Sequence, residues 1–205
     1  MQQLLNVEQV QLPQQLNATL RPYQLRGYNW LYKNASLGFG SLLADDMGLG
    51  KTLQVITFLL KWKQEGKLQE KPALIILPTT LITNWQKEIE KFAPQLKSAV
   101  YHGSGRDLKK VESTDIILTS YGVVRSYITQ LSKKNWSVVA IDEAQNIKNI
   151  TTEQTKAVKK LKANALIAMS GTPVENKLSE YWSIFDFANK GYLDTLKNFE
   201  DEYIK

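Results

Sequence analysis

The chain has 205 residues, 43% of them hydrophobic and 22% charged, which is the composition of a globular protein with room for one α/β domain and a substantial core. It contains no cysteine, so disulfides and cysteine-ligated metals are excluded. The net charge of +6 allows a polyanionic partner, although lysines on solvated helix faces would produce the same excess.

Neither a targeting segment nor a membrane segment is predicted. The first residues lack the basic start and the apolar core of a secretory signal. Apolar runs such as residues 55–60 and 73–77 are far too short to cross a bilayer. We therefore expect an intracellular protein, of the cytoplasm or of the nucleoid or nucleus, with no membrane partner.

Helices and strands alternate along the chain after a lead-in of residues 1–18, and a charged connector is expected at residues 61–71. Apolar spacings of three and four predict helices at residues 20–31, 52–60, 82–92, 124–131, 151–161 and 178–185. Thr151 and Gln154 are spaced as a capping box for the fifth of these, and the last carries Leu178, Tyr181, Trp182 and Phe185 on one face. Short apolar runs predict strands at residues 41–44, 72–77, 98–102, 115–120, 136–141 and 165–169.

This alternation predicts an α/β fold in which a mainly parallel sheet is covered by helices on both faces. Ligands of such sheets bind at the carboxyl ends of the strands. The polar residues of this chain lie just past several predicted strand ends, so we expect its chemistry at one edge of the sheet.

A glycine-rich turn after the first strand has the composition of a phosphate-binding loop. Gly48 and Gly50 allow a tight turn whose N–H groups point at one anion, and the following helix start adds its own free N–H groups. Lys51 would reach the β- and γ-phosphates, and the Thr52 hydroxyl would hold Mg²⁺. We therefore predict a nucleoside triphosphate site made by Asp46, Met47, Gly48, Leu49, Gly50, Lys51 and Thr52.

One position departs from the strict phosphate-loop pattern. Asp45 stands where that pattern has a glycine, five positions before Gly50. The alternative interpretation is a glycine turn in front of an ordinary surface helix.

Two adjacent carboxylates follow the strand at residues 136–141. A carboxylate at a strand end beside a phosphate loop can hold Mg²⁺, which suits Asp142. The next one, Glu143, can polarise a water for attack on the γ-phosphate. Adjacent acids after a strand can also form a plain solvated turn.

Taken together, these motifs resemble the N-terminal RecA-like lobe of the Swi/Snf-type DNA-translocating ATPases of helicase superfamily two. The matching blocks occur in the family's order, at residues 20–31, 45–52, 77–85, 117–121, 142–149 and 169–176. The family has Asp at the position of Asp45, which accounts for the missing glycine. The resemblance implies a RecA-like P-loop NTPase lobe at residues 19–190. Residues 191–205 would begin the connection toward a second RecA-like lobe, for which the chain has no room, so we expect a fragment of a longer protein.

The resemblance adds roles that spacing cannot show. It implies that Gln24 reads the adenine edge. Without the resemblance, adenine reader and surface helix residue would be equally good interpretations of Gln24. It places Thr79, Thr80, Thr119 and Ser120 along the phosphates of one DNA strand. Ser170 and Thr172 would link hydrolysis to lobe movement, although they could simply end a strand. Trp85 is expected in the core because it is in helical register with Ile89, and His102 receives no role.

Gln145 departs from the best-known family members, which have His after Asp-Glu-Ala. Glutamine cannot titrate near neutral pH, so a proton-transfer role is excluded there, but its amide can still hydrogen-bond toward the coupling block.

The predicted function is an ATP-binding and hydrolysing lobe of a double-stranded DNA translocase that remodels protein–DNA complexes. Its ligands would be ATP, Mg²⁺ and duplex DNA, and its second RecA-like lobe would supply an arginine finger. One alternative is an RNA-directed helicase lobe of the same superfamily. Another is a nucleotide-gated binding module that never hydrolyses, although such a module would not need Glu143.

Overall fold

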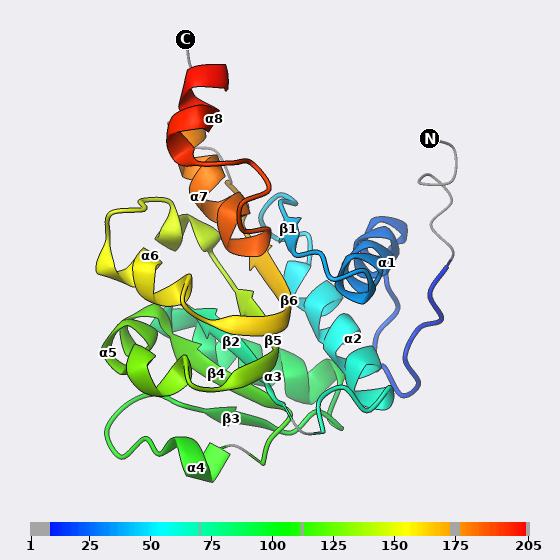
Figure 1. Cartoon of the computed structure of the whole chain (residues 1–205). Helices are drawn as coiled ribbons and strands as arrows, with labels where there is room; N and C mark the ends of the chain where they lie inside the picture. Colours follow the sequence, from blue (N-terminus) through cyan, green and yellow to red (C-terminus); the bar gives the residue numbers. More distant parts are fainter. Residues whose placement is uncertain (1–8, 70, 112, 173–176, 204–205) are drawn as a thin grey trace.

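Six parallel strands form one sheet in the computed structural model, which describes residues 9–69, 71–111, 113–172 and 177–203. The strand order is β1-β6-β5-β2-β4-β3 (Figure 1). The strands are β1 (Ser41–Leu43), β2 (Ala73–Leu77), β3 (Ser98–Val100), β4 (Ile116–Ser120), β5 (Asn135–Ile141) and β6 (Lys162–Met169). Every pairing is parallel, so all carboxyl ends lie at one edge, and the predicted fold class is confirmed.

Helices cover both faces of this sheet. The α-helices are α1 (Pro22–Ser36), α2 (Lys51–Gln64), α3 (Ile82–Phe92), α4 (Leu108–Val111), α5 (Tyr121–Leu131), α6 (Glu153–Val158), α7 (Leu178–Ala188) and α8 (Leu196–Tyr203). Two short 3₁₀ turns, η2 (Thr79–Leu81) and η3 (Ala144–Ile147), follow β2 and β5. The first three helices pack on one face, and α5, α6 and α7 pack on the other. No helix within the described ranges is both long and apolar enough for a membrane span.

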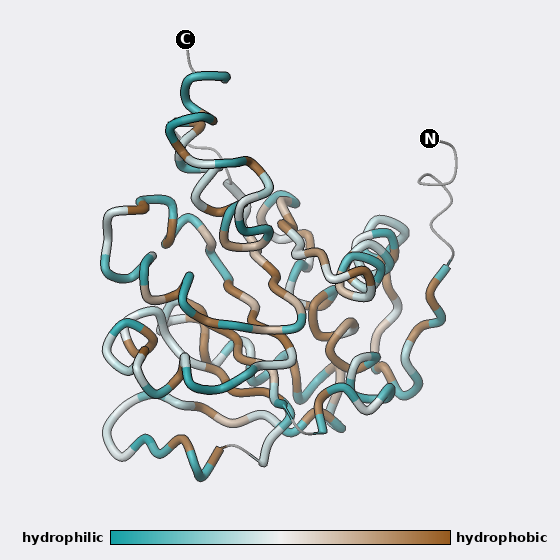
Figure 2. Tube along the Cα trace, in the orientation of Figure 1, coloured by the Kyte–Doolittle hydropathy of each residue, from teal (hydrophilic) through white to brown (hydrophobic). Residues whose placement is uncertain are grey.

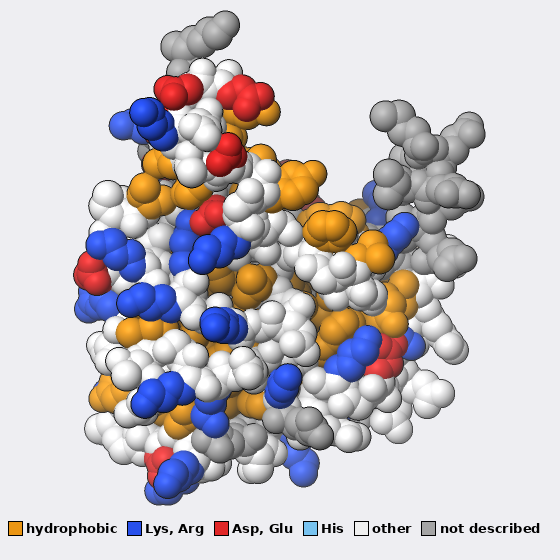
Figure 3. Space-filling model, viewed as in Figure 1, with side chains coloured by type: hydrophobic (Ala, Val, Ile, Leu, Met, Phe, Trp, Pro, Cys, Tyr) orange, Lys and Arg blue, Asp and Glu red, His pale blue; other side chains and the backbone are white. Residues whose placement is uncertain are grey.

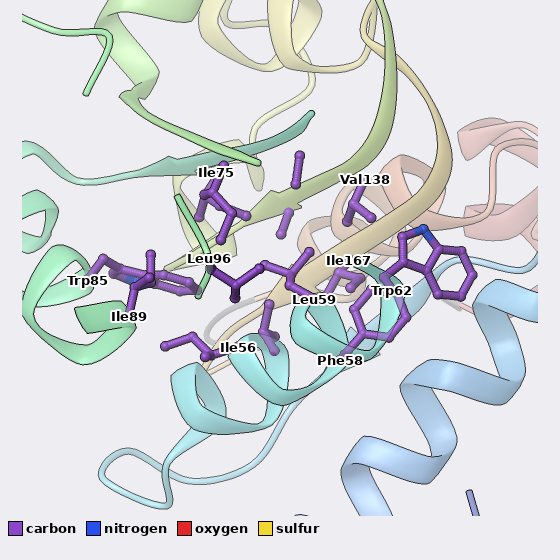
Figure 4. Close-up of a cluster of buried hydrophobic side chains, with 14 of the residues drawn as sticks. Ile56, Phe58, Leu59, Trp62, Ile75, Trp85, Ile89, Leu96, Val138 and Ile167 are labelled. Carbon is purple, nitrogen blue, oxygen red and sulfur yellow. The ribbon is translucent and has the colours of Figure 1, made fainter. Parts of the chain in front are cut away.

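Alternation along the central strands divides the core into two clusters, one on each face. In β2, Ile75 and Leu77 join the cluster under α1, α2 and α3, whereas Leu74 and Ile76 join the cluster under α5, α6 and α7. Because helices cover both faces of the sheet, every residue of β2 is apolar, which is typical of a buried parallel strand. Figure 2 shows the central strands in brown, and Figure 4 shows the first cluster between α2, α3 and the sheet.

Two local predictions are wrong. Residues 61–64 continue α2 instead of starting a connector, because Trp62 buries its ring in the first cluster. The cap of α6 is Thr152, whose Oγ1 accepts from the Thr155 N–H at 3.2 Å. Thr151 is held before the helix by the Asn149 carboxamide, to which its N–H and its hydroxyl both donate, so the predicted capping box does not form.

The buried face of α7 also differs from the prediction. The helix buries Ile184, Phe187 and Ala188, while Leu178 is 42% exposed. Apolar residues occur on nearly every side of this helix, so their spacing alone could not select the face that meets β6 and β1. The last helix, α8, was not predicted.

Candidate functional site

The predicted phosphate loop joins β1 to α2 at the carboxyl edge of the sheet. Gly48 and Gly50 have φ values of 79° and 74°, a left-handed conformation that side chains other than glycine rarely adopt. Gly50 is the N-cap residue of the 14-residue helix α2, and no side chain caps the helix there. The first-turn N–H groups of Lys51 and Thr52 are therefore directed at the loop, as an anion site requires. Asp46, Met47 and Gly48 are exposed along its rim.

The Lys51 ammonium folds back over this loop. Its Nζ donates to the carbonyl oxygens of Asp45 and Asp46 at 2.6 and 2.9 Å. The Asp45 carboxylate in turn accepts from Nε2 of Gln54 at 3.0 Å, and Gln54 is completely buried on α2. Asp45 thus ties the start of the loop to the second turn of the helix, a function that a glycine could not perform. Sequence reasoning missed Gln54, because a polar residue inside an apolar helix pattern gives no sign of its partner.

Gln24 lies against the same loop. It is 8% exposed, its Oε1 accepts from the Arg21 N–H at 2.9 Å, and its Nε2 donates to the Leu49 carbonyl at 3.1 Å. A Cβ on Gly50 would lie 2.4 Å from Nε2, so the loop glycine is needed for this approach. The carboxamide retains one N–H and one acceptor lone pair beyond these two bonds, and its role as adenine reader stays a prediction.

Asp142 and Glu143 extend β5 at the same edge. The Asp142 N–H donates to the Ile76 carbonyl at 2.8 Å, which continues the pairing with β2. The Asp142 carboxylate accepts from Nε1 of Trp85 at 2.8 Å and from the Glu143 N–H at 2.9 Å. The hydroxyl of Tyr121 donates to the main-chain carbonyl of Asp142 at 2.6 Å.

Burial dominates the electrostatics of this carboxylate. It raises the pKa of Asp142, and the nearby Glu143 charge raises it further. The hydrogen bonds from Trp85 and the Glu143 N–H lower that pKa, as does the positive charge of Lys51. The loop after β1 and the carboxylate after β5 both lie at the carboxyl edge of the sheet, on either side of β6, so the two predicted motifs belong to one site.

The predicted coupling residues are joined by hydrogen bonds. Glu143 has a left-handed φ of 52°, and its Oε2 accepts from Nε2 of Gln145 at 2.7 Å. The Gln145 Oε1 accepts from the Ser170 hydroxyl at 2.9 Å, and Ser170 Oγ accepts from the Thr172 N–H at 3.1 Å. The prediction that Gln145 bonds toward the coupling block is confirmed. Residues 173–176 of that block lie outside the described residues.

The four predicted nucleic-acid contacts have different surroundings. Thr79 and Thr80 are exposed in η2, just past the end of β2. Thr119 is completely buried and donates to the Tyr101 carbonyl at 2.8 Å, so its hydroxyl is not available to DNA, and we withdraw that prediction. Ser120 is 5% exposed, caps α5 through the Val123 N–H at 3.3 Å and lies 3.1 Å from Nδ1 of His102.

Trp85 is buried as predicted, and it also has a contact that its sequence position did not reveal. Its ring is 1% exposed beside Ile89 in the core cluster, and its N–H is directed at Asp142. Sequence reasoning missed this contact and that of Tyr121. The one available signal was chemical, because a buried indole or phenol needs a hydrogen-bond partner.

The residues present fit a Mg²⁺ ion that draws part of its coordination from nucleotide phosphates. Thr52 lies half-buried in the first turn of α2, and Asp142 offers a carboxylate whose oxygens each accept one hydrogen bond. Across the described ranges, no group of three or more His, Cys, Asp or Glu side chains could form an all-protein metal cage. Mg²⁺ characteristically uses one or two carboxylates with water and substrate phosphates, so the donor set matches this ion.

Comparison with known proteins finds relatives named as ATP-dependent helicases and as TATA-binding protein-associated factors. The chain is 47% identical, over 97% of its length, to the putative ATP-dependent helicase/translocase YwqA of Bacillus subtilis, of which it covers 22%. It is 37% identical over 95% of its length to the TATA-binding protein-associated factor MOT1 of Saccharomyces cerevisiae, of which it covers 11%. The chain thus spans about a fifth or less of these curated relatives.

The fold has a close structural counterpart. The Sulfolobus solfataricus SWI2/SNF2 ATPase core, solved in complex with double-stranded DNA, matches with a TM-score of 0.88 and 45% identity. The match covers 96% of this chain and 41% of that one. A family model, the SNF2-related domain, matches residues 23–205. The chain belongs to the SNF2-related domain family.

Proposed function

We propose that this chain is the first RecA-like lobe, at residues 19–190, of a Swi/Snf-type ATPase that moves along double-stranded DNA. The lobe would bind and hydrolyse ATP with Mg²⁺ and act with a second RecA-like lobe of a longer protein to remodel protein–DNA complexes. The observation that carries the proposal is geometric: the loop with Lys51 follows β1 and Asp142 follows β5, and both strands end at the same edge of the parallel sheet. The names of the relatives and of the structural counterpart support the choice of ATP and duplex DNA.

Each residue of the site has a distinct task in this proposal. The loop N–H groups, the start of α2 and Lys51 bind the phosphates. Thr52 and Asp142 would hold Mg²⁺, which supplies charge neutralisation at the β- and γ-phosphate oxygens when bound. Glu143 would orient the attacking water and accept its proton. The second lobe would supply an arginine finger, a further cation that neutralises charge on the γ-phosphate in the transition state.

The coupling residues give the lobe a way to respond to the γ-phosphate. Glu143 is linked through Gln145 to Ser170, and Ser170 to the Thr172 backbone. A shift of the Glu143 carboxylate would therefore move the segment after β6. We assign to this path the transfer of the hydrolysis state to lobe movement.

For DNA, we propose contacts to phosphates and none to bases. Exposed hydroxyls and N–H groups at Thr79 and Thr80 suit phosphate oxygens, which carry no sequence information. Figure 3 shows Lys and Arg side chains spread over α4, α5 and α6. In this region Lys156 pairs with Glu153 at 2.9 Å and Lys159 with Asp186 at 2.8 Å. Such dispersed charge predicts binding that is weak, independent of base sequence and steeply reduced by salt.

Substitution of Lys51 tests the nucleotide site. Lys51→Ala should weaken Mg-ATP binding by about 10–100-fold, because hydrogen bonds to charged groups contribute about 1.5–3 kcal/mol. Lys61→Ala is the control, since Lys61 lies on the same helix and pairs only weakly, at 3.7 Å, with Glu65. Calorimetric titration of all three proteins measures the affinities. Equal affinities for the unchanged chain and Lys51→Ala would overturn the ATP site.

A gel-shift series tests the nucleic-acid partner. Duplex DNA and duplex RNA of one sequence, and a second DNA of scrambled sequence, are compared from low to physiological salt. We expect the protein to bind the two DNA sequences with equal affinity, and we expect both complexes to dissociate as the salt concentration rises. Preference for duplex RNA would favour the RNA-directed alternative, and salt-insensitive selection of one DNA sequence would contradict phosphate-only contact.

A further inference from the structure

Two buried aromatic residues hold Asp142 from two different elements. Trp85 on α3 donates its indole N–H to Oδ2 at 2.8 Å, and Tyr121 at the start of α5 donates its hydroxyl to the main-chain carbonyl at 2.6 Å. The two residues are 1% and 4% exposed, and they belong to the core clusters on opposite faces of the sheet. Asp142 is therefore fixed at its side chain from one face and at its backbone from the other.

These contacts set the direction of the carboxylate. One oxygen is bound by Trp85 and the other by the Glu143 N–H at 2.9 Å, so rotation about the Cβ–Cγ bond would break both bonds. An ionised carboxylate has about four lone-pair positions, so each oxygen retains acceptor capacity for a cation or its water. The hydrogen bonds orient the group and leave it able to bind a metal.

The helix that carries Trp85 also borders the phosphate loop. A cavity of about 430 Å³ is lined by Gly50 and Leu53 from the start of α2 and by Asn84 and Glu88 from α3. Asn84 donates to the Glu88 carboxylate at 2.9 Å, and the Asp142 charge contributes to raising the pKa of Glu88, after the larger effect of burial. Side chains of α3 thus border the start of α2, next to the glycine-rich loop.

Burial by itself does not explain these partners. Two other buried indoles satisfy their N–H groups elsewhere, Trp62 on Ser137 Oγ at 3.0 Å and Trp136 on the Leu131 carbonyl at 3.1 Å. A backbone carbonyl would also satisfy the hydrogen-bonding need of the buried Trp85 N–H. Its N–H is instead directed at an ionisable side chain at a strand end. Outer partners of this kind orient metal-binding groups, and their loss typically costs 10–100-fold in metal affinity or activity.

We propose that Trp85 and Tyr121 are positioning residues of the ATP site, which orient Asp142 toward the nucleotide-bound Mg²⁺. This inference rests on the proposed function and adds two residues to it. Both lie close to the segments considered above for DNA phosphates, since α3 follows Thr79 and Thr80 and Tyr121 follows Ser120. Neither residue touches the reacting atoms in this account, because each acts through Asp142.

The test compares two substitutions with two matched controls. Trp85→Phe and Tyr121→Phe each remove one hydrogen-bonding group and keep an aromatic ring in the core. Trp62→Phe and Tyr28→Phe remove the same groups from equally buried rings, since Tyr28 is completely buried and donates to the Gln11 carbonyl at 3.0 Å. ADP affinity is measured by calorimetry in Mg²⁺ and in EDTA, and the melting temperature is measured for each protein.

The decisive quantity is the ratio of the ADP dissociation constant in EDTA to that in Mg²⁺. We expect Trp85→Phe and Tyr121→Phe to lower this ratio by about 10-fold, or to one, while affinity in EDTA is unchanged. The controls should lose similar thermal stability and keep the ratio of the unchanged chain. A purely structural role would lower the melting temperature of all four variants and leave every ratio unchanged.

The outcomes separate this inference from the function on which it rests. If the unchanged chain binds no nucleotide, the proposed function fails and the inference fails with it. If it binds nucleotide but Trp85→Phe and Tyr121→Phe behave like their controls, only the inference is overturned. Should Trp85→Phe not fold, Tyr121→Phe decides alone, because it removes a single oxygen atom.

Discussion

The Ser170 hydroxyl donates a hydrogen bond to Oε1 of Gln145 at 2.9 Å. On its other side the same carboxamide donates to the Glu143 carboxylate at 2.7 Å. An amide can do both at once because it carries a donor and an acceptor on one planar group. Twenty-five residues separate Gln145 from Ser170, so neither sequence position reveals the contact.

Breaking this path should separate binding from turnover. Gln145→Ala leaves Glu143 without its side-chain partner, so we expect unchanged Mg-ATP affinity and about 10²-fold slower phosphate release in a protein that joins this lobe to a second one. Asn146→Ala is the control, because the Asn146 carboxamide donates to the Glu143 main-chain carbonyl, at 2.9 Å, and not to the Glu143 carboxylate. Equal turnover by the two variants would remove the coupling role of Gln145.

Gln24 should decide base preference. If the Gln24 amide pairs with adenine, Gln24→Ala should lower the preference for ATP over GTP by about 1–3 kcal/mol, by analogy with side-chain pairing to DNA bases. Loss of the contact at the start of α1 should also reduce stability by about 1 kcal/mol. The ratio of ATP and GTP dissociation constants separates the two effects, since destabilisation affects both nucleotides equally. An unchanged ratio would leave Gln24 a structural residue.

The Asp142 carboxylate should make the nucleotide-free lobe less stable at neutral pH than at lower pH. Its pKa is raised by burial, so the folded state binds the proton more tightly than the unfolded state, and stability falls as pH rises from 3.8 through the folded-state pKa. Asp142→Asn removes the charge, and its urea midpoint should exceed that of the unchanged chain at pH 8. The difference should shrink as pH is lowered through that window.

Asp115→Asn is the control with the opposite sign. Asp115 accepts from Lys63 at 2.7 Å and from the Lys97 N–H at 2.7 Å, so removal of its charge breaks an ion pair and should lower the midpoint at pH 8. If Asp142→Asn destabilises the protein as much as Asp115→Asn does, the buried Asp142 charge does not lower the stability of the folded state.

A stability prediction concerns the contact between β1 and the end of α7. A Cβ on Gly40 would lie 2.0 Å from the Ala188 carbonyl oxygen. The Asn189 carboxamide accepts a hydrogen bond from the Gly40 N–H and donates one to the Gly40 carbonyl. Gly40→Ala should therefore destabilise the protein by about 1–3 kcal/mol. Gly122→Ala, in the first turn of α5 with no atom near its Cβ position, should instead stabilise by about 0.5–1 kcal/mol. Thermal melts measure both, and equal effects would show that the close approach is not required.

Much of the fold follows from the sequence because its signals are local. Continuous apolar runs such as Ala73–Leu77 indicate strands buried on both faces, and the glycines at positions 48 and 50 mark a turn that other residues would strain. Alternation of strands with helices then fixes parallel pairing, which brings the phosphate loop and Asp142 to one edge. Where local signals conflicted, as at Thr151 and along α7, the boundary or the buried face was wrong.

Only the tertiary structure decided which polar groups meet. Trp85 and Asp142 are 57 residues apart, and the buried Gln54 finds Asp45 across a loop. Thr119 has the composition of a phosphate contact but points into the core toward Tyr101. Helix and strand periodicity specifies which side of an element is apolar, because burial depends on position along one chain segment. A hydrogen bond between distant segments depends instead on how whole elements pack, within a few tenths of an ångström, and no local pattern carries that information.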